Sequence, residues 1–496
     1  MIQVGAFLAS LCPHIAFHCE VHCMNIRTLI MQFGNIAARE ANRGFRRSAR
    51  LRLVSLSLIS AVLLVACGGE KTGAVSTGGG PGGGSASVGS STALQTIVFT
   101  RDIGGQLDLF LVQEDGSALT PLAASPESES PSGIVVGTKL IFMRLVGGTQ
   151  YDLYSINTDG TTLTNLANST DDELAAGVTA SGRVIFMRVD LSSILPQFDL
   201  YSINADGTGL VTLANSADSE IFGSVTANDK VIFMRQVGGF LGQYDLFSIN
   251  ADGSGAEIAL ANSADSEFFA GVTPGGKVLF TRTQGGVQDD LYSVNDDGTS
   301  LTALANTAES EDLGGVISGE RVVLRRLDGG TQIDLYRINA DGTGGELPLA
   351  TSSDSEDFAG QTAGGQLIFD RLVGGTQFDL YSMNDDGTGV TPIATTTDDE
   401  LFAGISTSGR VVFDRVVGGT QIDVYSVNVD GTGLAPLANT SDVEFFGATT
   451  SNDRVIFRRL PGSGAQGDLY SINADGTGGE ITIANSTDDE QLGGVF

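Results

Sequence analysis

The amino-acid sequence predicts an all-β protein: a single closed β-propeller of four-stranded blades, nine in number, with eight blades and one displaced unit as the alternative. Three observations lead to this prediction. A motif of the form Asp-Leu-Tyr-Ser-Ile-Asn-x-Asp-Gly recurs nine times, at spacings of 44 to 47 residues. Each copy contains four short β-rich segments separated by turn residues. The array begins with the second segment of a copy and stops with the first segment of another.

The copy around residues 176–213 shows how each element is predicted. A glycine-containing segment at residues 176–179 leads through a tight turn to the apolar segment 184–188. A loop leads to the third segment, residues 199–204, which ends in an Asn-x-Asp-Gly turn whose glycine suits a left-handed conformation. Residues 210–213 form the fourth segment. No helical period is present, and a parallel β-helix would need shorter rungs and fewer hairpins.

The two ends of the array predict how the ring closes. Residues 95–99 are a second segment, and residues 492–496 are a first segment. We therefore expect the C-terminal segment to supply the missing strand of the first blade, because this pairing removes an open sheet edge.

The N-terminal region predicts export and a lipid anchor. An arginine cluster precedes an uncharged run at residues 53–66, which is short for a membrane span of about 20 residues. The run ends in Leu-Val-Ala-Cys, which resembles a bacterial lipobox and implies cleavage before Cys67 and lipidation of Cys67; an ordinary signal peptide is the alternative. We assign residues 1–66 to presequence and signal peptide, with Met24 or Met31 as the alternative start. Residues 67–93 are assigned to the lipidated cysteine and a Gly/Ser-rich linker, and residues 94–496 to the propeller.

Charge and rare residues exclude several functions. The chain has a net charge of −32, which opposes binding to nucleic acid or to an anionic lipid surface. Cleavage before Cys67 removes seven basic and two acidic residues, which leaves −37, and it removes every histidine and every other cysteine. Histidine bases, cysteine nucleophiles, histidine-ligated metals and disulfides are then excluded. We predict that the chain is not an enzyme and has no cofactor or metal, with Ca²⁺ as the alternative.

The repeat also resembles the TolB-type propeller repeat, which is related to WD-repeat blades. The hallmark of that family, D-[IL]-Y-x-[MVI]-N-x-D-G-[TG], stands here at residues 199–207 and in eight related copies. The resemblance implies a propeller that acts in protein–protein contacts of the cell envelope. This chain departs from the family pattern because the usual tryptophan and the N-terminal α/β domain of TolB are absent.

Two polar positions recur beside these motifs and are the candidate site residues. An arginine closes each second segment and is expected to form a structural ion pair between blades: Arg101, Arg144, Arg188, Arg235, Arg282, Arg326, Arg371, Arg415 and Arg459. A carboxylate pair precedes each first segment, as at Asp171/Glu173, Asp218/Glu220, Asp265/Glu267, Asp354/Glu356, Asp398/Glu400 and Asp442/Glu444. Propeller topology places both sets on one face, where surplus carboxylates would form an acidic surface for a basic partner or divalent cations.

Two other acidic positions are assigned to structure. The Asn-x-Asp-Gly turns lack the further acids of a calcium loop, so we assign them to turn chemistry. The first aspartate of each repeat motif, such as Asp199, is expected to bind backbone N–H groups where a strand begins.

These observations predict a non-catalytic, monomeric cell-envelope lipoprotein whose propeller is a protein-interaction or scaffolding module. We expect an envelope protein as the partner, membrane contact through the lipid anchor only, no nucleic acid, and a location at the outer membrane facing the periplasm or cell surface. The alternatives are a propeller that binds a divalent cation or carbohydrate, and a carboxylate-dependent hydrolase.

Overall fold

The computed structural model describes residues 94–496 except 124, 193–195, 240–241 and 463–465. The predictions for the signal peptide, for Cys67 and for the linker therefore lie outside the described residues. The regular structure of the described part consists of the strands β1 to β36 and contains no helix. Accordingly, no helix in this part is long and apolar enough to span a membrane.

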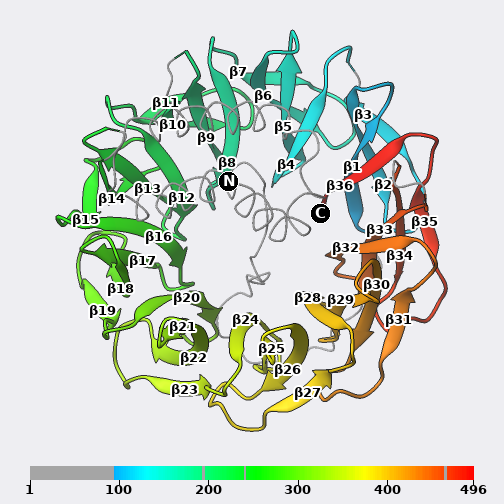
Figure 1. Ribbon diagram of the computed structural model, residues 1–496. Coiled ribbons are helices and arrows are strands. Elements are labelled where there is room, and N and C mark those ends of the chain that lie inside the picture. The colour runs from blue at the N-terminus through cyan, green and yellow to red at the C-terminus, as the bar shows by residue number, and fades with distance from the viewer. Residues whose placement is uncertain (1–93, 124, 193–195, 240–241, 463–465) are drawn as a thin grey trace, which may run out of the picture. The chain divides into compact units, whose positions relative to one another are not determined.

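Nine antiparallel sheets of four strands, the blades, are arranged in a ring (Figure 1). The innermost strands are β4 (Glu129–Val136), β8 (Asp172–Val178), β12 (Glu220–Val225), β16 (Ser266–Val272), β20 (Ser310–Ile317), β24 (Ser355–Gln361), β28 (Asp399–Ile405), β32 (Val443–Thr449) and β36 (Asp489–Val495). The second strands are β1 (Thr96–Asp102), β5 (Lys139–Val146), β9 (Arg183–Asp190), β13 (Lys230–Val237), β17 (Lys277–Gln284), β21 (Arg321–Asp328), β25 (Leu367–Val373), β29 (Val411–Val417) and β33 (Arg454–Leu460).

The third strands are β2 (Leu107–Gln113), β6 (Gln150–Asn157), β10 (Gln197–Asn204), β14 (Gln243–Asn250), β18 (Gln288–Asn295), β22 (Gln332–Asn339), β26 (Gln377–Met383), β30 (Gln421–Val427) and β34 (Asp468–Asn473). The outer strands are β3 (Thr120–Ala123), β7 (Thr164–Ala167), β11 (Val211–Ala214), β15 (Ile258–Ala261), β19 (Thr302–Ala305), β23 (Leu347–Ala350), β27 (Thr391–Ala394), β31 (Ala435–Ala438) and β35 (Ile481–Ala484).

The two ends of the array close the ring as predicted. The sheet order β3-β2-β1-β36 places the last strand of the chain in the first blade. Thr96 and Phe496 exchange both of their backbone hydrogen bonds, at 3.1 and 2.9 Å. The prediction of an all-β propeller with nine blades is thereby confirmed, and the eight-blade alternative is excluded.

Apolar residues on both faces of each blade form the core between blades. In the first junction, Val98 and Leu109 of one blade pack with Leu140 and Phe142 of the next. Eight of the nine second strands place a fully buried phenylalanine, such as Phe413, in such a junction. Its ring stacks on an aromatic ring of the third strand, as Phe413 does on Tyr425 at 5.8 Å between centroids.

The glycines of the innermost strands have a packing role. The ring of Phe446 lies against Gly404 of the preceding blade, and that of Phe222 lies against Gly177. A Cβ atom at Gly404 or Gly177 would come within 2.9 or 2.7 Å of these rings. Glycine therefore allows neighbouring blades to approach at the centre of the ring, where they converge.

The propeller has two faces, which we name by their connections. The loop face carries the loops between an outer strand and the next innermost strand, together with the turns between second and third strands. The turn face carries the two remaining sets of turns, including the Asn-x-Asp-Gly turns. On the turn face, eight of the nine blade junctions contain a side-chain hydrogen bond from the third strand to a carbonyl of the next blade. Ser471 makes this bond to Glu114 and so joins the last blade to the first.

Candidate functional site on the loop face

Each blade has an ion pair between its arginine and a buried glutamate. The Nε atom of the arginine lies 2.8–3.2 Å from Oε1 of the glutamate, whose side chain is fully buried. The two residues face each other on neighbouring strands of one blade, as Glu173 on β8 and Arg188 on β9 do. The pairs are Arg101–Glu490, Arg144–Glu129, Arg188–Glu173, Arg235–Glu220, Arg282–Glu267, Arg326–Glu311, Arg371–Glu356, Arg415–Glu400 and Arg459–Glu444. The prediction of a pair between blades is therefore wrong, because the strand register places the partner within the blade.

The loop from the preceding blade completes the surroundings of each glutamate. The backbone N–H of Ser169 donates to Oε1 of Glu173 at 2.8 Å, and the hydroxyl of Ser486 donates to Oε1 of Glu490 at 2.5 Å. The Oε2 atoms of both glutamates are buried and have no hydrogen-bond partner among the described residues. Burial also raises the pKa of the equivalent Glu129 to about 7. These glutamates are structural groups held between strands and loop.

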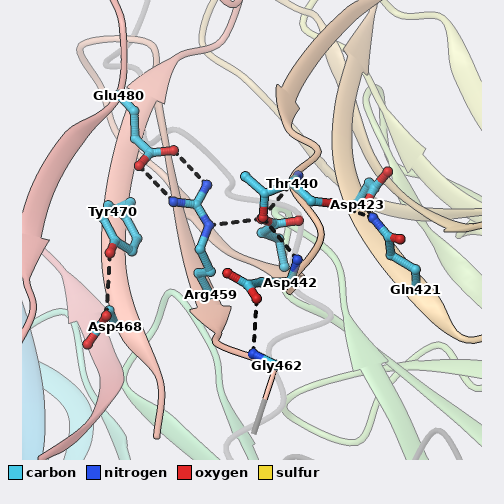
Figure 2. A network of polar contacts seen from close by, with 10 residues as sticks. Gln421, Asp423, Thr440, Asp442, Arg459, Gly462, Asp468, Tyr470 and Glu480 are labelled. Atoms are coloured by element: carbon cyan, nitrogen blue, oxygen red, sulfur yellow. Dashed lines mark hydrogen bonds and ion pairs between the residues drawn. The ribbon is translucent and has the colours of Figure 1, made fainter. Parts of the chain in front are cut away.

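The guanidinium group of each arginine lies over aromatic rings of its own blade. Its central carbon is 4.4–4.7 Å from the ring centroid of the third-strand aromatic residue. This is a cation–π contact of a largely buried arginine, so it fixes the direction of the arginine side chain. Figure 2 shows one example, in which Arg459 lies near Tyr470 and contacts Glu480.

The first member of each predicted carboxylate pair has a different position. Asp171, Asp218, Asp265, Asp354, Asp398 and Asp442 are half-exposed in the loops. Oδ1 of Asp398 accepts a hydrogen bond from Gly418 N at 3.0 Å in the turn between second and third strands, and Asp442 does the same with Gly462 (Figure 2). The predicted acidic surface therefore needs a correction: Glu173, Glu220, Glu267, Glu356, Glu400 and Glu444 are buried and do not belong to it.

The six aspartates are members of a complete ring of nine loop carboxylates. Glu127, Glu309 and Asp488 are half-exposed at the equivalent positions of the other three blades. Among the described residues, none of these nine forms an ion pair. The nine recurring arginines are paired with buried glutamates, and Arg325 and Arg458 beside them are paired with other aspartates. The loop carboxylates therefore carry uncompensated negative charge on this face.

The first aspartate of the repeat motif is held by a glutamine that sequence reasoning missed. Nε2 of Gln150 donates to Oδ1 of Asp152 at 2.7 Å and to the carbonyl of Ser169 at 2.6 Å. Eight of the nine blades show this Gln–Asp bond. The expected bond to backbone N–H groups is therefore wrong for these eight blades. The spacing Gln-x-Asp, which recurs in all nine copies, is the signal that could have indicated the pair.

The turn-face aspartates follow the expected turn chemistry. Oδ1 of Asp206 accepts hydrogen bonds from the backbone N–H of Thr208 at 2.9 Å and from its hydroxyl at 2.7 Å. These bonds lower the pKa of Asp206, which keeps the exposed carboxylate ionised. The described residues contain no group of three or more acidic, histidine or cysteine side chains placed to hold a metal ion.

No family model matches the chain. A search of curated proteins also found no match. Solved structures do resemble it. A dipeptidyl peptidase 4 from Porphyromonas gingivalis is 10% identical, with a TM-score of 0.53, over 72% of this chain and 58% of that one. A putative TolB from Agrobacterium tumefaciens is 15% identical, with a TM-score of 0.31, over 48% and 88% of the two chains. A puromycin-hydrolyzing peptidase from Mycobacterium tuberculosis is 12% identical, with a TM-score of 0.39, over 68% and 59%.

These comparisons correct the prediction that the chain is not an enzyme. The dipeptidyl peptidase 4 chain, with a TM-score of 0.53, shows that a propeller of this fold occurs in an enzyme, so the fold gives no ground for excluding catalysis. The chain spans between half and three-fifths of the length of those peptidase chains. At identities of 10–14% the likeness shows the propeller fold and does not assign a reaction.

Proposed function

We propose that this protein is a cell-envelope lipoprotein whose propeller binds a basic protein partner through the loop face. The observation that carries the proposal is the ring of nine half-exposed carboxylates, one in each blade, on a face where nine arginines are paired with buried glutamates and two more, Arg325 and Arg458, with aspartates. Such a surface attracts cationic groups and accelerates their association at low salt.

The distribution of the charges favours a protein over a small ion. The loop carboxylates are separated, with one in each blade, and the described residues hold no cluster suited to a metal. A folded partner with several lysine or arginine side chains can contact many blades at once, and stable protein interfaces bury about 800 Å² on each partner. A ring of separated charges suits this type of contact.

The entry point of the chain is compatible with a tether. Gln95, next to the first described residue, accepts a hydrogen bond from the backbone N–H of Ser451 in a turn of the turn face. A tether formed by the Gly/Ser-rich residues 67–93 would then join the propeller at the turn face. The loop face would remain open to a partner, and the lipobox-like sequence before Cys67 and the TolB-like repeats support an envelope location.

Crosslinking in cells tests this function. The full-length chain would be compared with a variant that carries Asp171→Asn, Asp218→Asn, Asp265→Asn, Asp398→Asn and Asp442→Asn. Asparagine removes the charge but keeps an oxygen that can accept the glycine N–H bond seen at Asp265, Asp398 and Asp442, so the fold is expected to remain. We expect a crosslinked basic protein with the wild type and at least tenfold less of it with the variant, which corresponds to about 1.4 kcal/mol.

A control variant has the same change in net charge on the other face: five Asp→Asn substitutions at Asp159, Asp206, Asp297, Asp341 and Asp386. We expect this control to retain the partner. Equal loss in both variants would show that total charge, and not the loop face, determines capture. An unchanged partner in both variants would contradict the proposal.

A further inference from the structure

One position at the rim of the propeller, directly before the outer strand, has two kinds of side chain. In six blades it is an exposed aliphatic residue, with 44–52% of its surface accessible: Leu119, Leu163, Leu210, Leu301, Val390 and Leu434. In the other three blades it is Glu257, Glu346 or Glu480, and the turn before it is one residue longer. The blades thus provide two versions of one site within a single chain.

The three glutamates bind the outer edge of the blade arginine. Glu257 contacts Nη1 and Nη2 of Arg235 at 2.6 and 2.7 Å. Glu480 contacts the same two atoms of Arg459 at 2.8 and 2.7 Å, as Figure 2 shows. Glu346 places both carboxylate oxygens 2.8 Å from Nη2 of Arg326. In these blades the arginine therefore binds two carboxylates: the buried one through Nε and the rim one through Nη.

The other six arginines have the same setting without the second carboxylate. Each stacks on its aromatic ring and binds the buried glutamate through Nε, as Arg188 does with Tyr201 and Glu173. Among the described residues, no side chain forms an ion pair or hydrogen bond with the Nη atoms of these six. In Arg415, Nη2 is buried and has no hydrogen-bond partner among the described residues. A buried donor that lacks a partner carries a desolvation cost of about 1–3 kcal/mol, which a carboxylate at this place would remove.

In the three blades that have it, the rim carboxylate is partly open to solution. The side chains of Glu257, Glu346 and Glu480 remain 29, 27 and 33% exposed while they contact the arginine. In the other six blades an exposed aliphatic side chain stands at the same position in the chain. A guanidinium edge beside an aliphatic surface matches a ligand that has a carboxylate head and an apolar tail.

We propose that the rims of these six blades are binding sites for aliphatic carboxylates, which occupy the place that glutamate fills in the other three blades. We call them the rim sites; each consists of the guanidinium edge of Arg101, Arg144, Arg188, Arg282, Arg371 or Arg415 and the aliphatic residue before the outer strand of the same blade. The carboxylate can belong to a free short-chain acid or to an acidic side chain of a protein segment. The rim sites do not depend on the loop carboxylates or on the function proposed above.

Saturation-transfer NMR of the full chain with hexanoate tests the rim sites, since it detects weak binding from the ligand signals. The measurement would be made in about 0.15 M salt, which limits repulsion by the acidic surface to within about 8 Å. We expect saturable transfer to hexanoate and none to hexylammonium, while hexanol shows how much the tail contributes alone. No saturable transfer to hexanoate, or equal transfer to hexylammonium, would overturn the proposal.

Two variants change the number of rim sites in opposite directions. The closing variant converts all six aliphatic turns into the longer glutamate turn. In each of these blades, the three residues that end at the aliphatic position, such as 208–210, are replaced by the four residues Ser-Gly-Ala-Glu, which is the sequence of residues 254–257. In the opening variant, Glu257→Leu, Glu346→Leu and Glu480→Leu remove the resident carboxylates. The wild type has six rim sites, the closing variant has none and the opening variant has nine. Saturation transfer to hexanoate should therefore fall to background in the closing variant and rise about 1.5-fold in the opening variant.

A fold control accompanies both variants. The closing variant adds ion pairs, so we expect its urea midpoint to be at least that of the wild type, and loss of transfer cannot then be assigned to unfolding. Transfer that stays equal in both folded variants would overturn the proposal. A glutamate-containing peptide that displaces hexanoate would assign the rim sites to protein segments; hexanoate binding without displacement by the peptide would assign them to small acids.

Discussion

The two faces of the propeller use the same residue types in different ways. On the loop face, nine arginines each bind a buried glutamate of their own blade, and Arg325 and Arg458 bind aspartates. The loop carboxylates have no cationic partner among the described residues. On the turn face, basic residues lie near aspartates of the next blade. For example, hydrogen bonds from Thr299 lower the pKa of Asp297, and Lys230 of the preceding blade lowers it further. Among the described residues, none of the aspartates of the Asn-x-Asp-Gly turns forms an ion pair either. The two faces therefore differ in the local partners of their carboxylates, which on the turn face are the threonine or serine of the same turn.

The faces also differ in what their polar contacts hold together. The nine arginine–glutamate pairs of the loop face join two strands within a blade, whereas the turn-face hydrogen bonds from the third strand join neighbouring blades. Arg183 combines both roles on the turn face, because it donates to Ser202 and Asn204 of its own blade and to the carbonyl of Ala251 in the next. Both faces therefore hold neighbouring blades together, since on the loop face the backbone N–H of Tyr151 donates to Oδ1 of Asp172 in the next blade at 2.9 Å.

The largest expected effect comes from breaking a loop-face ion pair. Arg144→Met would leave Glu129 fully buried without its cation, at a cost of about 3–5 kcal/mol in unfolding free energy at pH 8. Burial already raises the pKa of Glu129 to about 7, and loss of the arginine raises it further. A raised pKa means that the ionised form is disfavoured in the folded state, so the cost should grow from pH 5 to pH 8. Urea unfolding at both pH values measures it.

The turn-face counterpart of that substitution is Arg183→Met. It removes hydrogen bonds but leaves no buried carboxylate unpaired, so we expect a cost of about 1–2 kcal/mol without the same rise between pH 5 and pH 8. A larger cost for Arg183→Met than for Arg144→Met would contradict the assigned roles of the two faces.

The bond that closes the ring on the turn face has a smaller expected effect. Ser471→Ala removes the hydrogen bond to Glu114 between the last and first blades and should lower the unfolding free energy by about 1 kcal/mol. The reason is that Ser471 is fully buried and the carbonyl loses a donor. Hydrogen exchange of β1 and β36 should increase more than that of β20, which is remote from the closure; equal increases would refute a local closing role.

Relief of backbone strain in a turn of the turn face should have a still smaller effect, and it should stabilise the protein instead of destabilising it. Thr162 has a φ of +56°, while the equivalent residue of the next blade is Gly209, with a φ of +65°. Thr162→Gly should raise the midpoint of thermal unfolding slightly, by the equivalent of up to about 1 kcal/mol. The reverse change, Gly209→Thr, should lower it, since a Cβ atom there would also approach Asn204 to 2.9 Å. Shifts of the same sign in both variants would contradict strain as the cause.

The smallest effect concerns an exposed turn aspartate. Hydrogen bonds from Thr208 lower the pKa of Asp206, so its contribution to stability is present above the unfolded pKa and is lost as the pH falls through the folded pKa. Asp206→Ala should therefore lower the thermal midpoint slightly at pH 7 and not at strongly acidic pH. A difference that persists unchanged in acid would show that the carboxylate charge is not involved.

The fold could be predicted from the sequence because the repeat contains it. Nine copies of four apolar segments with hairpin turns specify the blades, and the split of one copy between residues 95–99 and 492–496 specifies the closure. These features are local or periodic, and they do not require knowledge of any single contact. The candidate site was harder to predict from the sequence, because it depends on the strand register and on which side chains are buried.

The residues of one carboxylate pair show why. Asp171 and Glu173 are two apart, which would place both on one side of a strand, but β8 begins at Asp172. Asp171 therefore lies in the loop, where strand alternation does not apply, and Glu173 points into the junction and is buried. The partner of Glu173 follows from the register of β8 with β9, which the sequence pattern alone does not determine. The rim glutamates lie in turns one residue longer, a signal that is visible only after the blades are aligned.

The salt dependence of partner binding tests the central claim, that the uncompensated loop face is the binding surface. The partner captured by crosslinking would be titrated onto the wild type and onto the loop-face and turn-face asparagine variants at about 0.05 M and about 0.3 M salt. We predict that the wild type and the turn-face variant bind more weakly at the higher salt concentration. The loop-face variant should bind weakly at both concentrations. Binding that is independent of salt, or a loop-face variant that binds as the wild type does, would contradict the account.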